Sequence, residues 1–321
     1  MSGAPRLPPV ARAIVAGDRR ALARTITAVE NDDPSAGPVV RALYPRTGKI
    51  PVIGLTGPLG VGKSSLLSSL IGRLRAAGRT VAAIAVDPSS PFSGGSVLGD
   101  RIRLERRADD DGVYFRSMAS RGEAGGIAAA TREVARLLEA AGFDLVFVET
   151  VGSGQVDVAI REVATTSVVV LVPHLGDEVQ TLKAGLFEIA DIFDVNKSDL
   201  PGAERASRDL SELASLGRSA DGWTPRIVRT STTPPMGLDE LWADIEAHER
   251  FLDESGGRVA GERRRLSHEI AERVRERVGR DVTVRLDRDR ELRSLLDRVV
   301  ARRTDPASAA DRLYRERYRA R

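Results

Sequence analysis

A glycine-rich loop that could bind phosphate is the clearest chemical feature of the sequence. Gly57 is followed after four residues by Gly62, Lys63 and Ser64, and the loop lies between an apolar run and a helical pattern. In that context backbone N–H groups can surround a β-phosphate, while Lys63 reaches phosphate oxygens and Ser64 offers a magnesium ligand. A glycine turn that only links strand to helix is the alternative. The predicted nucleotide contacts are Gly57, Pro58, Leu59, Gly60, Val61, Gly62, Lys63, Ser64 and Ser65.

Acidic residues at the ends of apolar runs could hold a magnesium ion beside the phosphates. Glu149 ends the run LVFVET, and the residues that follow it up to Gly152 have the form of a switch whose glycine N–H meets a γ-phosphate. Asp87 ends another run, and a Ser/Gly-rich segment leads from it to Asp100. Asp87 could instead belong to an Asp-Pro turn, and Asp100 to a helix N-cap. The predicted metal ligands are Ser64, Asp87, Asp100 and Glu149, and the predicted catalytic residues are Lys63, Asp87 and Glu149.

A third motif could select the base. Asn196, Lys197 and Asp199 directly follow an apolar run late in the chain. An aspartate accepts hydrogen bonds from both donors on the guanine edge, whereas adenine has no such pair, and a lysine stem can lie along the ring. Adenine would therefore leave the carboxylate unpaired, which predicts a strong preference for guanine. Ser231 and Thr232, which follow the last apolar run, are further candidates for contacting the guanine carbonyl.

Alternating strands and helices must position these motifs. Short apolar runs recur from Pro51 onward with helical stretches between them, which is typical of a parallel sheet with crossover helices. The expected strands cover residues 51–56, 81–86, 113–116, 145–150, 167–173, 192–196 and 226–230. We predict an α/β fold in which a P-loop NTPase domain, with a mostly parallel sheet flanked by helices, occupies residues 48–255. A helical extension over residues 1–47 precedes it, and a helical arm over residues 256–321 follows it.

The predicted arm carries an apolar stripe at helical spacing. The stripe consists of Ile270, Val274, Val278, Leu292, Leu295 and Leu296. We expect the arm to pack on the nucleotide domain or on a second subunit, and we expect a homodimer. A solvated helical extension is the alternative.

The composition excludes several classes of protein. The chain has 321 residues, of which 41% are hydrophobic, enough for one large core or two small ones. It has no cysteine, which excludes disulfides and thiolate metal sites and favours a cytoplasmic location. The net charge is +3 with both signs interleaved, so nucleic-acid binding is not indicated. We expect no membrane association, because no apolar run is long enough to span a bilayer and the first residues do not resemble a secretory signal.

Taken together, GPLGVGKSSL, DPSSPFSGGSVLGDRIRL, ETVGSGQ, LGDEVQTLKAG and VNKSD, in this order, resemble the MeaB/ArgK family of P-loop GTPases, which includes the methylmalonic aciduria type A protein. The resemblance extends to LARTITAVEN near the start and DPASAADRLYRE near the end. It implies a Mg²⁺-dependent GTPase that binds an adenosylcobalamin-dependent acyl-CoA mutase, gates loading of its cofactor and protects it. Methylmalonyl-CoA mutase is the expected client, although GSGQVD and RSMASRGEAGG depart from the family's usual pattern and leave other mutases open. The family also implies an extra switch that responds to the partner, here at Asp177, Glu178 and Lys183.

Other functions remain as alternatives. A GTP-dependent metal-delivery protein would need a cluster of metal ligands, but the chain has no cysteine and its histidines, at positions 174, 248 and 268, are far apart in sequence. An ATPase linked to amino-acid transport, a label that some family members carry, conflicts with the guanine-type Asp199. A nucleotide-gated scaffold would differ from an enzyme only in its rate of nucleotide hydrolysis, which would be negligible. No arginine finger can be named, so we expect slow basal hydrolysis that a partner accelerates.

Overall fold

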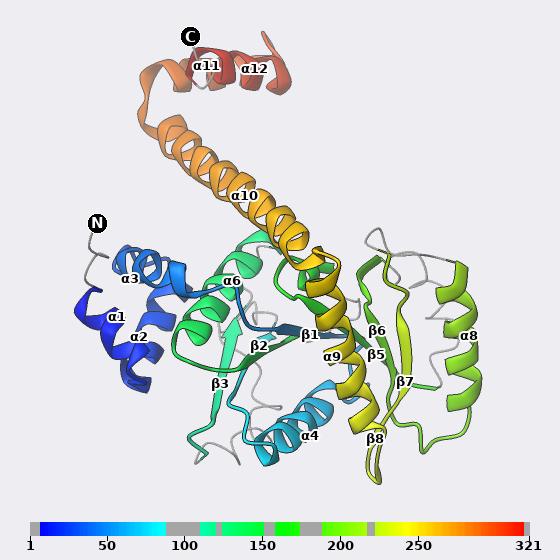
Figure 1. Cartoon of the computed structure of the whole chain (residues 1–321). Coiled ribbons are helices and arrows are strands. Elements are labelled where there is room, and N and C mark those ends of the chain that lie inside the picture. The colour runs from blue at the N-terminus through cyan, green and yellow to red at the C-terminus, as the bar shows by residue number, and fades with distance from the viewer. Residues whose placement is uncertain are drawn as a thin grey trace. The chain divides into compact units, whose positions relative to one another are not determined.

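A seven-stranded parallel sheet forms the centre of the fold (Figure 1). Its strands lie in the order β3-β2-β4-β1-β5-β6-β7, and every neighbouring pair is parallel. Their bounds are β1 Val52–Thr56, β2 Val81–Asp87, β3 Val113–Ala119, β4 Leu145–Thr150, β5 Thr166–Leu171, β6 Ile192–Val195 and β7 Arg226–Arg229. The α/β fold and the strands predicted from the apolar runs are confirmed, with small shifts at the strand ends.

The computed structural model describes residues 7–87, 110–119, 124–150, 158–173, 188–216 and 222–317. The chain divides into two compact units, residues 1–263 and residues 264–321. The boundary between them falls inside a long helix, α10 (Gly257–Arg288). The sequence-based division at residues 47 and 255 stays a proposal.

Both faces of the sheet are covered, which explains why its strands are apolar almost throughout. On β4, Leu145 and Phe147 point to one face while Val146 and Val148 point to the other. Helices α4 (Lys63–Ala76) and α9 (Leu238–Glu254) cover the first face. The second face is covered by α6 (Ala124–Ala140) and the N-terminal helices at one end and by α8 (Ala203–Leu216) at the other. The short elements are η1 Tyr44–Arg46, η2 Val158–Glu162, β8 Ser231–Thr232 and β9 Pro235–Met236.

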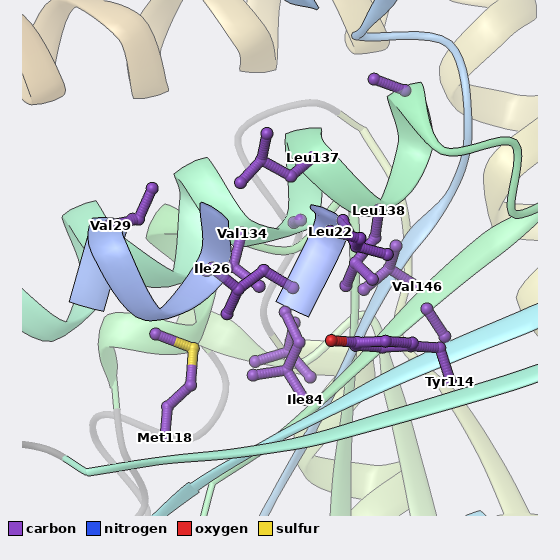
Figure 2. Close-up of a cluster of buried hydrophobic side chains, with 14 of the residues drawn as sticks. Leu22, Ile26, Val29, Ile84, Tyr114, Met118, Val134, Leu137, Leu138 and Val146 are labelled. Atoms are coloured by element: carbon purple, nitrogen blue, oxygen red, sulfur yellow. The ribbon is translucent and has the colours of Figure 1, made fainter. Parts of the chain in front are cut away.

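Three helices precede the sheet (Figure 1); the second and third pack against α6, and the first packs against the other two. They are α1 Pro9–Val15, α2 Arg19–Glu30 and α3 Ala36–Leu43. The Asp18 carboxylate caps α2 by accepting hydrogen bonds from the backbone N–H groups of Arg20 and Ala21. Figure 2 shows Leu22 and Ile26 of α2 packed in one apolar cluster with Val134 of α6. The predicted N-terminal extension is therefore helical, and it shares its core with the sheet.

The second unit is helical, as predicted for the arm. It contains the greater part of α10, then α11 (Arg290–Val300) and α12 (Pro306–Arg317). Of the predicted apolar stripe, Leu292 is buried, whereas Ile270, Val274 and Leu296 are exposed. What the exposed part contacts stays a prediction. Among the described residues, no helix combines the length and apolar character needed to cross a bilayer.

Candidate nucleotide-binding site

The predicted phosphate loop connects β1, the fourth of the seven strands, to the N-terminus of α4. Two of its glycines are required by close packing. Gly57 has φ 145°, and a Cβ there would lie 2.2 Å from the carbonyl oxygen of Val170 on β5. Gly62 has φ 99°, and a Cβ there would lie 2.5 Å from Nδ2 of Asn196. Only glycine readily adopts these positive φ values so close to β5 and to the Asn196 side chain.

The Lys63 ammonium group lies inside the loop. Its Nζ donates hydrogen bonds to the carbonyl oxygens of Gly57, at 2.7 Å, and Pro58, at 2.9 Å. The side chain is buried, although Leu59 and Gly60 in the same loop are exposed. Because the N-terminus of α4 carries its own positive partial charge, two positive groups lie together at this point. The arrangement suits an anion with several oxygens, such as a di- or triphosphate.

A hydroxyl and a carboxylate meet beside the loop. Ser64 Oγ donates a 2.6 Å hydrogen bond to Oε1 of Glu149, and both side chains are buried. Glu149 comes from β4, where it is in register with Leu55 of β1, so the strand pairing sets the distance between the two groups. Hydroxyl and carboxylate oxygens are ligands that Mg²⁺ prefers. Ser64 and Glu149 therefore fit the predicted metal site.

The remaining predicted acids are described in part or not at all. Asp87 ends β2, whose Val86 pairs with Thr150 of β4, so its backbone lies at the same edge of the sheet as Glu149. The structure does not describe its side chain. The predicted site residues Asp100, Gly152, Asp177, Glu178 and Lys183 lie outside the described residues. Their roles stay predictions.

The predicted base motif contacts the phosphate loop directly. Asn196 follows β6, is buried, and donates from Nδ2 to the carbonyl oxygen of Val61 at 2.8 Å. Lys197, which has φ 57°, donates from Nζ to the carbonyl oxygen of Gly60 at 2.8 Å. The two motifs are separated by more than a hundred residues in sequence, yet the fold joins them through two hydrogen bonds. This is the arrangement needed if one nucleotide spans both.

The carboxylate predicted to recognise guanine is oriented by a serine. Asp199 is exposed, and its Oδ1 accepts a 2.8 Å hydrogen bond from Oγ of the buried Ser231. Thr232 follows in the two-residue strand β8 and is half-buried. The structure thus places Ser231 beside Asp199, where the sequence predicted a contact with the same base, and the contacts of both residues with guanine stay predictions.

Two residues that the sequence analysis did not single out lie beneath the base motif. Asp194 of β6 is fully buried, and its Oδ1 accepts a 2.7 Å hydrogen bond from Oγ1 of Thr230. Burial raises the pKa of the Asp194 carboxyl to about 7, even though the hydrogen bond from Thr230 opposes the shift. The signal available in the sequence was a carboxylate in the middle of an otherwise apolar strand.

One of the three histidines considered for the metal-delivery alternative, His248, is buried and contacts other side chains of the protein. His248 of α9 is buried, with Nδ1 2.8 Å from Oγ1 of Thr166 and Nε2 3.6 Å from Oδ1 of Asp191. Burial raises the pKa of Asp191, while His248 and Arg161 act in the opposite direction. In the described part of the chain, no group of three or more His, Asp or Glu residues could hold a metal ion.

A protein-family model matches most of the chain. The model of the methylmalonyl-CoA mutase-associated GTPase MeaB matches residues 22–286. This range contains the phosphate loop, the Ser64–Glu149 pair and the base motif.

Individual relatives and a solved structure are also similar to this chain over most of its length. A Pyrococcus abyssi protein that is named a GTPase is 47% identical over 303 residues, which cover 94% of this chain and 93% of that protein. The mouse mitochondrial methylmalonic aciduria type A homolog is 32% identical over 276 residues, 80% of this chain and 66% of its own. Among solved structures, the LAO/AO transport system kinase is 27% identical with a TM-score of 0.73, covering 98% of each chain.

Proposed function

The chain belongs to the MeaB family of methylmalonyl-CoA mutase-associated GTPases, and on that premise we propose that it is a G-protein chaperone of an adenosylcobalamin-dependent acyl-CoA mutase. Methylmalonyl-CoA mutase is the first candidate client because the family's description names it. In this role, the bound nucleotide controls loading of the cofactor into the mutase and protects the mutase from inactivation. GTP hydrolysis returns the chain to the state that releases the client.

One observation supports the nucleotide part of the proposal above all others. The hydrogen bonds from Asn196 to Val61 and from Lys197 to Gly60 connect the base motif to the phosphate loop. A nucleotide bound along this line has its phosphates at the N-terminus of α4 and its base near Asp199. The exposed Asp199 carboxylate, oriented by Ser231, then accepts from the two guanine donors.

The proposed chemistry uses residues from both sides of the phosphate loop. Lys63 moves from the loop carbonyls to the β- and γ-phosphate oxygens, where its charge offsets the charge that develops during transfer. Ser64 and Glu149 hold Mg²⁺, which supplies further neutralisation of the phosphates when bound. Asp87 and Asp100 complete the metal environment, and the N–H group of Gly152 contacts the γ-phosphate.

Further parts of the proposal concern the partner, the oligomeric state and the location of the protein. Asp177, Glu178 and Lys183 form the switch that responds to the mutase, and basal hydrolysis is slow until the mutase binds. We propose a homodimer that uses the exposed stripe of the arm, including Ile270, Val274 and Leu296. A cytoplasmic location is proposed because the chain has no cysteine.

An affinity experiment tests the choice of client. The full chain is loaded with a non-hydrolysable GTP analogue or with GDP and incubated with native cell extract, and the retained proteins are identified by mass spectrometry. We expect a cobalamin-dependent mutase whose retention depends on the nucleotide. The matched control is Asp199→Ala, which loses the guanine contact and should remove that dependence. Absence of a mutase in both states would contradict the chaperone role and leave a GTPase with another client.

A rate measurement tests the proposed coupling. Phosphate release from GTP is followed for the purified chain alone and after addition of the mutase recovered above. We expect a slow basal rate that the mutase accelerates. Rapid hydrolysis by the isolated chain, unchanged by the mutase, would contradict the coupling.

A further inference from the structure

A carboxyl group lies in apolar surroundings directly below the base motif. Asp194 is the third residue of β6, and its neighbours in register are Val170 on β5 and Val228 on β7. Both valines belong to the apolar cluster between the sheet and helices α4 and α9. Within the described structure, Oδ2 of Asp194 has no hydrogen-bond partner. An ionised carboxylate is costly in such a place, because the charge is desolvated and only one oxygen is paired.

Thr230 connects this carboxyl group to the base motif. Its Oγ1 lies 2.7 Å from Oδ1 of Asp194 and 3.3 Å from Oδ1 of Asn196. All three side chains are buried. The amide of Asn196 is oriented by its other end, because Nδ2 donates to the carbonyl oxygen of Val61 in the phosphate loop. The Oδ1 atom of Asn196 is therefore the end that faces Thr230.

The hydroxyl of Thr230 has one hydrogen and two acceptors within reach. When Asp194 is ionised, it can only accept, and the shorter distance directs the hydrogen to it. When Asp194 is protonated, its own O–H can donate to Thr230, which frees the Thr230 hydrogen for Asn196. Asn196 is then held at both ends, by Thr230 and by the phosphate loop.

We propose that Asp194 is a positioning residue of the nucleotide site, which acts through Thr230 on Asn196 and makes guanine-nucleotide affinity depend on its protonation. Protonated Asp194 gives the tighter site, and ionised Asp194 gives the weaker one. The inference rests on the proposed placement of the nucleotide along Asn196 and the phosphate loop. It adds a control that the phosphate loop and the base motif do not contain by themselves.

The electrostatic surroundings agree with this role. Burial raises the pKa of Asp194 to about 7, so the carboxyl changes state near neutral pH. Three charged or titratable groups on the packed elements have hydrogen bonds or ion pairs with other residues. Arg226 of β7 pairs with Asp244 of α9, and Lys63 of α4 is bonded to the loop carbonyls. His248 of α9 is bonded to Thr166.

The decisive experiment measures the dissociation constant of GDP from pH 6 to pH 8.5 by titration calorimetry. The variants are Asp194→Asn, which cannot titrate, Thr230→Val, which removes the hydroxyl, and Thr230→Ser, which retains it. Titration of GDP itself is common to all of them. In the wild type we expect affinity to fall by about fivefold, relative to Asp194→Asn, as the pH rises through 7, because one hydrogen bond to Asn196 is lost. Thr230→Ser should retain this step, and Thr230→Val should lack it and bind GDP weakly throughout.

Ile192→Val provides the matched control, because Ile192 is a fully buried residue of the same strand outside the hydrogen-bonded chain. It should show the wild-type pH step, so a loss of the step cannot be attributed to a loosened strand. An identical pH dependence in the wild type and Asp194→Asn would overturn the role of Asp194 alone. Equal affinity of the wild type for GDP and ADP would instead overturn the placement of the guanine site, and the inference with it.

Discussion

Replacing Asp194 with asparagine should stabilise the protein at neutral and alkaline pH. Asp194 is fully buried, and its carboxyl has a pKa of about 7 in the folded chain against an ordinary value of 3.8. Because the folded-state pKa is raised, folding favours the protonated form. The stability that Asp194 contributes is fully present below the unfolded pKa and is lost as the pH rises through the folded pKa. Asparagine has no charge to desolvate and escapes this loss.

The size of the effect follows from the difference between the two pKa values. About three pH units separate them, which corresponds to about 4 kcal/mol at 1.36 kcal/mol per unit. Between pH 5 and pH 8 the unfolded carboxylate is already ionised. Over this range the free energy of unfolding of the wild type should fall by about 3 kcal/mol relative to that of Asp194→Asn. That is a large part of the free energy of unfolding of a typical folded domain, which is about 5–15 kcal/mol.

Chemical denaturation followed by tryptophan fluorescence measures this difference. The free energy of unfolding is determined for the wild type and Asp194→Asn at several pH values from 5 to 8, and the difference between the two is plotted against pH. Ile192→Val serves as the control, because its cost of about 1 kcal/mol should not depend on pH. A difference between the wild type and Asp194→Asn that stays constant over this range would refute the reasoning, since it would mean that Asp194 is not protonated in the folded chain.

Three further predictions concern the site and the core. Asp199→Ala should weaken GDP binding at least about 100-fold without changing ADP binding, because the carboxylate pairs with donors found only on guanine; calorimetric titration with both nucleotides measures this, and unchanged GDP affinity would contradict the base assignment. Glu149→Gln should weaken magnesium binding in the GTP complex about tenfold or more, since the amide can still accept from Ser64 but has lost the charge; a magnesium titration of GTP affinity checks it, and an unaltered midpoint would remove Glu149 from the metal site. Ile26→Ala should lower the free energy of unfolding by about 2–5 kcal/mol, because Ile26 is fully buried in the cluster with α6. GDP affinity should not change in this variant, and a large loss of binding would show that the N-terminal helices act on the site.

Much of this site can be predicted from contiguous motifs. The phosphate loop is one short segment, so the spacing of Gly57, Gly62 and Lys63 already defines the backbone and charge that it presents. Glu149 was predictable for a related reason, because a polar residue at the end of an apolar strand lies at the edge of a parallel sheet where ligands bind. The strand positions followed from apolar runs, since strands covered on both faces have few polar residues.

The contacts between segments could not be predicted in this way. The hydrogen bond from Asn196 to Val61 exists because β6 lies next to β5, and β5 next to β1, an order that no local pattern specifies. The pairing of Ser64 with Glu149 likewise depends on β4 lying beside β1.

The sequence by itself determined where the chemistry is expected: in a glycine-rich phosphate loop, in a guanine-type motif and at the acids predicted to bind magnesium. Only the tertiary structure decided how Asp194 behaves. Its pKa depends on the apolar side chains of β5 and β7 and on the hydroxyl of Thr230, which lies 36 residues away in sequence. Desolvation is a property of the whole packed environment and not of the residue, so the control proposed for Asp194 follows only from the folded chain.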